Sequence, residues 1–522
     1  MRFARFGALV LVALAIALVA GCGGTSGNGD ADPAMVAPKS SAVYAVATIS
    51  PEGDQRDAVN SVARKLFGES NPGRAISQSL QRAIKRSRSA GDLDYDKDIK
   101  PWLGRRAAVA VTQGQSAGGR ITGAVMIASK DLDTTRAAIS KLERGQRLSK
   151  GSYRGVSYDV DRSDQSTVGV VGDFLVLGFR TDGFRAVVDA SKDGGLVDTP
   201  SFQVAKHRGE GKLALAYLDV KGFVGAALQR LPAEQRSAVQ GALGGAGAKP
   251  AIATLDAKEN QVSFELVAPA GNRRAGGSPA GAGAVIGGLP GDSWAAFGIP
   301  RVGQALTSSL RTFQSGLGGA AIGPIRTELR RRTGLDLERD ILAALGDVAF
   351  FARGTSLLTV GGGAVIKSQD PAAARRLVSR IGALIARQGA AARVRVSSTQ
   401  IGGASGVKIT SARVPGAVNL VAKGDRLVLA YSDPATTEAL SPSTKLSEST
   451  TYRRAAATLG GISPSLFVDF APVLTFVDAV TANRSDASVT RARQVLQGLD
   501  TLALGSRAEG DQQLVRFVLR LK

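Results

Sequence analysis

Two serine motifs and a single histidine are the residues of this 522-residue chain that could support nucleophilic catalysis. Ser116 stands in the run GQSAG, which matches the G-x-S-x-G pattern of a nucleophile elbow, and His207 lies downstream of it. A nucleophile elbow needs a helix directly after the serine, but here a further apolar strand is expected from Ile121 onwards. The motif therefore favours a hairpin loop, and a serine hydrolase using Ser116 and His207 ranks third among three functional hypotheses.

The second serine motif is Ser405-Gly-Val-Lys408, which has the S-x-x-K spacing of penicillin-recognising enzymes. That chemistry places both side chains on one helical turn. Residues 406–412, GVKITSA, are instead expected to form a strand, in which positions three apart point to opposite faces. We interpret this match as accidental.

An acidic run at Asp92, Asp94, Asp96 and Asp98 raises the question of a calcium site. An EF-hand loop needs Gly at its sixth position and Glu at its twelfth, and neither occurs when counting starts at Asp92 or Asp94. The run is better explained as the start of a helix with Asp94 as its N-cap. With one histidine and one cysteine in the whole chain, no multi-histidine or thiolate metal site can be built, and neither a metal nor a cofactor is expected.

The N-terminus carries the pattern of an exported protein. Two arginines precede an apolar run over residues 7–20, as in a secretory signal peptide. The sequence VAGC that ends at Cys22 resembles the lipobox of bacterial lipoproteins, and the resemblance implies cleavage before Cys22 and a lipid on its thiol. We therefore predict a signal peptide over residues 1–21, a flexible tether over 22–39, and an extracytoplasmic body anchored to the bacterial cell membrane by the lipid on Cys22.

The chain is strongly basic, with 66 Lys+Arg against 44 Asp+Glu and a formal net charge of +22. Such a surface attracts polyanions, and the predicted anchor puts anionic lipid headgroups and acidic envelope polymers within reach. Aromatic residues make up only 5% of the chain, and no zinc-finger or P-loop spacing occurs. Nucleic acid is therefore not an expected partner.

The sequence contains an internal repeat. GDLDYDKDIKPWLG at 91–104 aligns with TGLDLERDILAALG at 333–346, which places Asp336 opposite Asp94. Further matches follow in the same order, namely 123–131 with 363–370, 172–179 with 424–431 and 213–220 with 464–471. We predict a first repeat over residues 40–269, a Gly/Ala/Pro linker over 270–291 and a second repeat over 292–522.

Each repeat alternates short apolar strands with amphipathic helices. Asp131 and Asp370 stand where helix N-caps are expected, and Gly172 and Gly424 stand where tight hairpins are expected. Successive strands joined by short turns pair antiparallel. The expected fold is α+β, with two tandem repeats that each contain a mostly antiparallel sheet with helices packed on one side.

The two acidic segments, LDYDKDIKPWLGRRAAVAV at 93–111 and LDLERDILAALGDVAFFA at 335–352, together with the early strand at Val43-Tyr-Ala45, resemble the bacterial family DUF3352. The resemblance covers nearly the whole mature chain. It implies a surface or envelope protein, and it brings no catalytic residues.

These observations favour a non-catalytic, lipid-anchored envelope protein with a binding or interaction role, and the ligand could be an apolar molecule held between the repeats. The alternative is a basic scaffold for anionic lipid or wall polymer. No enzymatic activity is expected. The aromatic residues to examine near any cleft are Tyr44, Trp102, Tyr217, Trp294 and Tyr431, although core packing explains each of them equally well.

Overall fold

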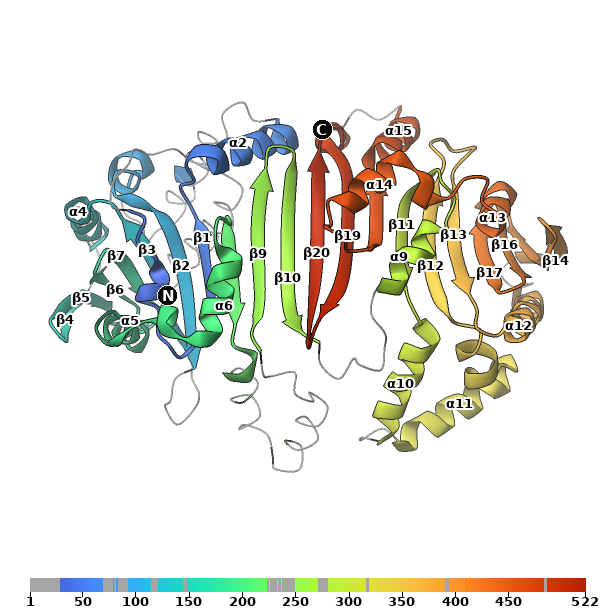
Figure 1. The fold of residues 1–522 in the computed structure, drawn as a ribbon, viewed down its shortest axis with the longest axis horizontal. Helices are drawn as coiled ribbons and strands as arrows, with labels where there is room; N and C mark the ends of the chain where they lie inside the picture. Colours follow the sequence, from blue (N-terminus) through green and yellow to red (C-terminus); the bar gives the residue numbers. More distant parts are fainter. Residues whose placement is uncertain are drawn as a thin grey trace. The chain divides into compact units, whose positions relative to one another are not determined.

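The structure is a computed structural model, and apart from a few isolated positions it describes residues 29–68, 93–113, 121–143, 148–222, 249–270, 280–315, 319–389, 394–412, 414–482 and 486–522. The chain divides into two compact units, unit 1 (Met1–Pro269) and unit 2 (Ala270–Lys522). Figure 1 colours unit 1 from blue to green and unit 2 from yellow-green to red. Each unit combines helices with an antiparallel sheet, so the α+β prediction is confirmed.

The described part of unit 1 contains a ten-stranded antiparallel sheet with the order β4-β5-β6-β7-β3-β2-β1-β8-β9-β10. Its strands are β1 (Ser41–Thr48), β2 (Leu103–Gln113), β3 (Ile121–Ser129), β4 (Leu148–Tyr153), β5 (Val156–Asp161), β6 (Thr167–Val171), β7 (Phe174–Gly178), β8 (Ala214–Leu218), β9 (Ala251–Lys258) and β10 (Gln261–Pro269). Its helices and helical turns are η1 (Pro33–Met35), α2 (Gly53–Phe67), η2 (Tyr95–Ile99), α4 (Leu132–Glu143), α5 (Thr181–Asp193), η3 (Leu196–Asp198) and α6 (Pro200–Gly209).

The described part of unit 2 has a sheet whose strands pair in the order β14-β15-β16-β17-β13-β12-β11-β18-β19-β20. Its strands are β11 (Ser293–Ile299), β12 (Asp347–Arg353), β13 (Gly361–Lys367), β14 (Val394–Ile401), β15 (Ala404–Ser411), β16 (Val414–Lys423), β17 (Arg426–Tyr431), β18 (Pro464–Asp469), β19 (Leu499–Glu509) and β20 (Gln512–Leu521). The helices and helical turns are α9 (Ala280–Gly287), α10 (Val302–Ser315), α11 (Gly319–Thr333), η5 (Leu337–Leu342), α12 (Pro371–Gly389), α13 (Asp433–Leu440), η6 (Leu446–Glu448), α14 (Thr450–Ala457), α15 (Phe470–Val480) and α16 (Ala487–Gly498).

Helices cover both faces of the unit 1 sheet, so the prediction of helices on one side is wrong. In β3, Met126 belongs to the same buried cluster as Phe184 of α5, whereas its neighbour Val125 belongs to the cluster that contains Leu142 of α4. Since successive side chains of a strand point to opposite faces, α4 and α5 lie on opposite sides of the sheet. Strand β3 is apolar at nearly every position, and both of its faces must therefore be covered.

The sheet of unit 2 is covered in the same way. Leu420 of β16 packs in a cluster with Leu377 of α12. Its neighbour Asn419 points the other way, and its Nδ2 donates a hydrogen bond of 3.0 Å to Oγ1 of Thr436 in α13. Helices α12 and α13 therefore lie on opposite faces of β16.

Two segments expected to be flexible contain packed residues. Within the tether predicted over 22–39, Ala34 and Ala37 are 1% and 0% exposed and belong to the unit 1 core. Within the predicted linker over 270–291, α9 forms, and Ile286 and Leu289 near its end are fully buried. The packed parts of both units therefore begin before the predicted boundaries, because a few small or aliphatic side chains in each segment fill space against the sheet.

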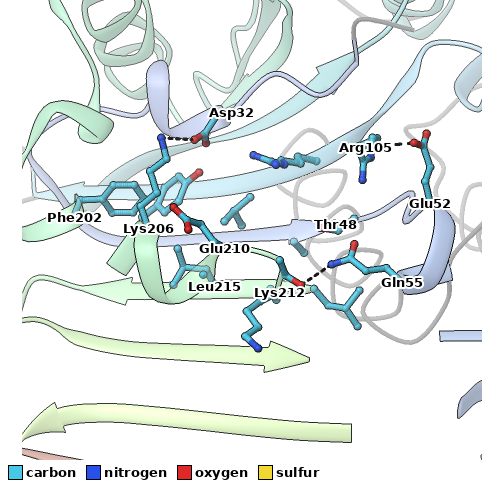
Figure 2. A pocket seen from close by; sticks show the side chains of 18 of the residues that line it. Asp32, Thr48, Glu52, Gln55, Arg105, Phe202, Lys206, Glu210, Lys212 and Leu215 are labelled. Atoms are coloured by element: carbon cyan, nitrogen blue, oxygen red, sulfur yellow. Dashed lines mark hydrogen bonds and ion pairs between the residues drawn. The ribbon is translucent and has the colours of Figure 1, made fainter. Parts of the chain in front are cut away.

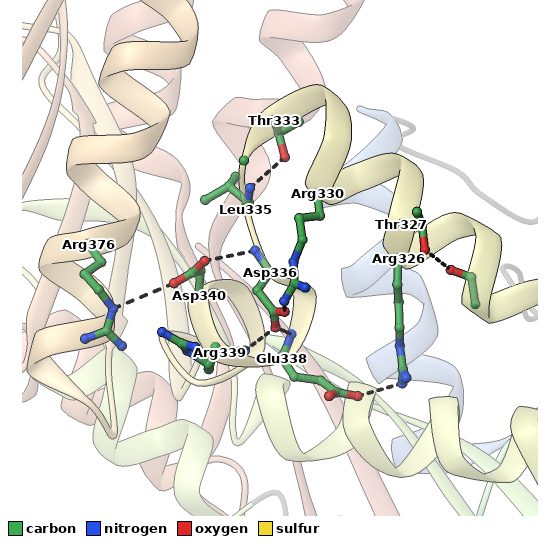
Figure 3. Close-up of polar contacts among 12 residues, drawn as sticks. Arg326, Thr327, Arg330, Thr333, Leu335, Asp336, Glu338, Arg339, Asp340 and Arg376 are labelled. Atoms are coloured by element: carbon green, nitrogen blue, oxygen red, sulfur yellow. Dashed lines mark hydrogen bonds and ion pairs between the residues drawn. The ribbon is translucent and has the colours of Figure 1, made fainter.

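The predicted N-caps form at all four positions. The Asp94 carboxylate accepts from the backbone N–H groups of residues 96 and 97, and that of Asp336 accepts from residues 338 and 339. Each of these two caps begins a short π-helical turn, η2 or η5; Figure 3 shows the one at η5. Asp131 and Asp370 likewise cap α4 and α12. These caps could be predicted from the sequence because an N-cap depends only on residues close to it along the chain.

The predicted hairpins are present as well. Gly172 joins β6 to β7 with a φ of 54°, and Gly424 joins β16 to β17 with a φ of 57°. A positive φ at the turn matches the twist of the flanking strands, and glycine adopts it without steric cost.

Candidate ligand-binding cavity in unit 1

The residues that sequence motifs singled out for catalysis do not form a described site. Ser116 and Asp92 lie outside the described residues, as does Cys22. His207 lies on α6 with its side chain 85% exposed, and its Nδ1 is 3.4 Å from Oε2 of Glu210. Across the described residues, no group of three His, Cys, Asp or Glu side chains could hold a metal ion.

The serine-lysine motif lies on β15, as the strand prediction required. Lys408 Nζ is 2.6 Å from Oδ2 of Asp433, and so the ammonium group is held by a carboxylate on α13. Ser405 is exposed on the same strand. The motif therefore forms part of an ion-pair contact between a strand and a helix.

A cavity of about 460 Å³ lies within unit 1 (Figure 2). Strands β1 and β8 form its floor, the start of β2 and the first turn of α2 form one wall, and α6 with the loop to β8 forms another. Volumes of this size accommodate small organic ligands. The cavity is therefore the candidate binding site of the described chain.

The floor of the cavity is apolar and aromatic. The ring of Phe202, on α6, packs edge-to-face against Tyr44 on β1, with 5.2 Å between the ring centroids. Tyr217 on β8, which lies opposite Tyr44 in the strand pairing, also packs edge-to-face against Phe202 at 5.4 Å, and Leu215 from the same strand lines the cavity. These three rings fix one another, so the floor is preformed and not assembled by a ligand.

The rim of the cavity carries both positively and negatively charged side chains. It is lined by four basic and four acidic residues, which are Arg105, Arg106, Lys206, Lys212, Asp32, Glu52, Asp54 and Glu210. The ion pairs between them are long, 3.8 Å from Arg105 Nη1 to Glu52 Oε2 and 3.7 Å from Lys206 Nζ to Asp32 Oδ2. Both distances exceed a direct hydrogen bond, although Nη1 of Arg105 also donates to Oδ2 of Asp30 at 3.3 Å.

Two hydrogen-bond donors in the cavity wall have no partner. The hydroxyl of Tyr44, whose side chain is 0% exposed, and Nε of Arg105 are both buried without a hydrogen bond. A buried donor without an acceptor costs about 1–3 kcal/mol. An oxygen acceptor in the cavity would satisfy these donors after a small movement of the wall, because neither atom is accessible to solvent.

The environment keeps the Tyr44 hydroxyl protonated. Burial raises its pKa well above the usual value, the charge of Asp32 raises it further, and Arg106 opposes this in part. At neutral pH the group is therefore a hydrogen-bond donor, which favours an acceptor as its partner.

The α6–β8 loop is tied down on both sides. Nε2 of Gln55, in the first turns of α2, donates a 2.8 Å hydrogen bond to the carbonyl of Gly211, whose φ is 71°. The backbone N–H of Thr48 donates at 2.8 Å to the carbonyl of Leu213. The loop wall is therefore a fixed part of the cavity.

Of the aromatic residues selected from the sequence, only Tyr44 lines this cavity, and Tyr217 packs on Phe202, which lines it too. Trp102 is 4% exposed and its Nε1 donates at 2.7 Å to the carbonyl of Asp98. Trp294 and Tyr431 belong to unit 2. Sequence reasoning missed Arg105 and Phe202, which carry no motif; the double arginine after the Leu-Gly step was the only available signal.

No helix in the described part of the chain has the length and apolar character needed to cross a membrane.

A model of one protein family matches residues 5–522, and its description is "Protein of unknown function (DUF3352)". No curated protein matches the sequence. Crystal forms I, III and IV of TP0453 match with sequence identities of 12%, 12% and 11% and TM-scores of 0.26, 0.26 and 0.25. The matches cover 47%, 47% and 46% of this chain and 80%, 81% and 80% of TP0453. At TM-scores this low, the similarity carries no argument about function.

Proposed function

We propose that this chain, which belongs to the DUF3352 family, is a non-catalytic lipoprotein of the bacterial cell envelope that binds an amphiphilic ligand in the cavity of unit 1. The lipobox-like sequence at Cys22 supports the anchor. The preformed cavity supports the binding role. In this proposal Ser116 and His207 take no part in chemistry.

The observation that carries the binding role is the Tyr44 hydroxyl, buried without a partner in the cavity wall together with Nε of Arg105. Two unpartnered donors favour a ligand with an oxygen acceptor, such as a carboxylate or a phosphate. A nearby cation strengthens a hydrogen bond to such a group. Phe202 and Leu215 line the same cavity and offer contact to an apolar group. The ligand class is therefore an oxyanion joined to a short apolar portion.

The ligand is tested by mass spectrometry of lipid extracts from the purified, lipidated full chain. Tyr44→Phe removes the donor and keeps the ring, and Tyr217→Phe is its matched control, because both rings pack on Phe202. We expect an oxyanion-bearing amphiphile with the wild type and with Tyr217→Phe, and several-fold less of it with Tyr44→Phe. Equal recovery from all three proteins contradicts the assignment of the site.

The alternative of a basic scaffold for anionic lipid or wall polymer gives a different result. Binding through the surface charge of a mature chain with 64 basic and 44 acidic side chains falls steeply with added salt. A ligand held in the cavity beside buried groups is screened less. Retention that disappears in high salt and does not depend on Tyr44 supports the scaffold instead.

The anchor is tested separately with Cys22→Ser. We expect the wild-type chain in the membrane fraction, with a diacylglyceryl group on the peptide that begins at Cys22, and the variant without that group. An unmodified Cys22 in the mature protein contradicts the proposal.

We further infer that the two units descend from one duplicated sequence. The inference is supported by the aligned segments and by the described strand pairings, in which β1 to β10 and β11 to β20 follow the same order. An experimental structure in which residues 42–269 and 292–522 fail to superpose contradicts it.

A further inference from the structure

The loop between β12 and β13 presents two leucines to solvent. Leu357 is 68% exposed and Leu358 is 98% exposed, and they are the two most exposed large apolar side chains among the described residues. Two neighbouring leucines that are exposed to solvent to this extent contribute nothing to the core. An exposed apolar feature of this kind marks a contact with an apolar partner.

The backbone of this loop is hydrogen-bonded within itself. Oγ1 of Thr359 accepts from the N–H groups of Thr355 and Ser356 at 3.2 and 3.1 Å. Oγ of Ser356 accepts from the N–H of Thr359 at 3.2 Å, and the carbonyl of Ser356 accepts from the N–H of Val360 at 2.8 Å. The N–H groups of Thr355, Ser356, Thr359 and Val360 therefore have acceptors within the loop, which lowers the cost of moving these four groups away from water.

The base of the loop is fixed to the body of unit 2. Nε1 of Trp294 donates a 2.9 Å hydrogen bond to the carbonyl of Gly354, where the loop begins. The adjacent guanidinium of Arg353 binds Asp292 through Nη2 at 2.6 Å and through Nε at 3.0 Å. The two leucines are thus held out by a preorganised loop, and little conformational entropy remains to be lost on binding.

We propose that Leu357 and Leu358 form a membrane-inserting tip, which enters the lipid bilayer at the interface between headgroups and acyl chains. The tip supplies the apolar contact, while Trp294, half-buried at its base, is a residue type that favours the headgroup region. Without Arg2 and Arg5 of the predicted signal peptide, 64 basic and 44 acidic side chains remain, and this net charge of +20 draws the protein to an anionic surface. The proposal rests on the membrane location given by the proposed anchor and is independent of the cavity in unit 1.

The first test measures vesicle binding of the mature chain, residues 22–522, with Cys22→Ser, so that neither the predicted signal peptide nor an acyl anchor contributes. The tip variant carries Leu357→Ser and Leu358→Ser. The matched control carries Val204→Ser and Ile325→Ser, which remove two apolar side chains that are 53% and 62% exposed elsewhere. Cosedimentation is measured with phosphatidylcholine vesicles and with vesicles that also contain phosphatidylglycerol.

We expect the tip variant to bind both kinds of vesicle about tenfold more weakly than the parent, and the control to bind like the parent. Phosphatidylglycerol should strengthen binding of all three proteins, because charge attraction is separate from insertion. A tip variant that binds as well as the control overturns the proposal, as does a parent chain that binds neither vesicle.

A second measurement follows insertion directly in the lipidated full chain. Leu357→Trp places a fluorophore in the tip, and Val204→Trp is the control at another exposed position. In vesicles of lipids with brominated acyl chains, we expect the additional emission to be quenched in the tip variant and to persist in the control. Equal quenching of the two variants contradicts insertion of the tip even if the anchor and the cavity ligand are found as proposed.

Discussion

The main-chain N–H of Asp336 donates a hydrogen bond to the carboxylate of Asp340, with 2.9 Å between N and Oδ2 (Figure 3). The same relationship joins Asp94 to Asp98 at 2.7 Å. In both turns the first aspartate caps the turn that follows, and the second reaches back to the backbone of the first. The D-x-x-x-D spacing thus closes a short π-helical turn with two carboxylates.

The second aspartate of each pair also binds a cation from the helix that packs on the turn. Asp340 Oδ2 lies 3.2 Å from Nη1 of Arg380 in α12. Asp98 Oδ2 lies 2.6 Å from Nζ of Lys141 in α4. The aspartate therefore joins the turn to a helix that begins more than thirty residues later along the chain.

Replacing Asp340 by Ala should destabilise unit 2. Its carboxylate is 3% exposed, and its loss leaves the N–H of Asp336 without its acceptor and Arg380 without its nearest anion. We expect the free energy of unfolding to fall by about 2–3 kcal/mol in urea denaturation followed by circular dichroism.

Asp478→Ala is the control for that prediction. Asp478 binds Nε of Arg493 at 2.8 Å, but its side chain is 52% exposed, and a surface pair contributes less than about 1 kcal/mol. Equal losses for the two variants would show that Asp340 is no more than a surface charge.

The pH dependence of the unfolding free energy should show the contribution of the ionised Asp98 carboxylate. Burial opposes ionisation of this carboxyl, but the hydrogen bonds from Lys141 and from the backbone of Asp94 outweigh it and hold its pKa below the usual value. A lowered native pKa adds stability above the unfolded pKa of about 4, and that stability is lost as the pH falls through the native value. The difference in unfolding free energy between wild type and Asp98→Asn should therefore be constant at neutral pH and shrink below about pH 4.

Asp469 should affect the pH dependence of stability in the opposite direction. Burial raises the pKa of its carboxyl, although the N–H of Ala471 bonds to it at 3.0 Å and the side chain caps α15. Asp469→Asn keeps an acceptor and removes the buried charge, so the variant should gain stability relative to wild type as the pH rises above about 4. A gain that appears only in acid contradicts this reading.

The caps and hairpins could be predicted from sequence because each depends on residues within a few positions of one another. Asp94, Asp131, Gly172 and Gly424 all behave as their neighbours indicate. The antiparallel pairing followed from the short turns. These signals establish the class of the fold, and they say nothing about which distant segments meet.

The cavity could not be predicted, because its parts come from four separated stretches of chain. Asp32, residues 44–55, Arg105 with Arg106, and residues 202–215 meet only after η1, β1, β2 and α6 have assembled. That a hydroxyl has no partner is a property of the whole surrounding shell, and no spacing encodes it. The sequence prediction placed helices on one face of the sheet only, because it did not distinguish a fully apolar strand such as β3 from a strand buried on one face.

The Leu-Gly step shared by the two acidic segments has a steric cause. A Cβ added at Gly346 would lie 1.9 Å from the carbonyl oxygen of Lys367, where the start of β12 passes the end of β13; at Gly104 it would lie 2.6 Å from that of Ala128. Gly346→Ala must therefore move the backbone, and we expect a loss of about 1–3 kcal/mol in unfolding free energy. Gly323→Ala, in α11 with no atom within 4 Å of the new methyl group, should lose nothing.

Tyr44→Phe should leave the ligand-free protein as stable as the wild type or up to about 1 kcal/mol more stable. The hydroxyl has no hydrogen bond to lose, and the ring keeps its contact with Phe202. Tyr217→Phe, whose hydroxyl lies 2.9 Å from Oγ of Ser201, should lose about 1 kcal/mol. Urea denaturation of the delipidated proteins separates the two cases. If Tyr44→Phe lowers the unfolding free energy more than Tyr217→Phe does, the Tyr44 hydroxyl has a hydrogen-bond partner within the protein. The argument that this hydroxyl binds a ligand then fails.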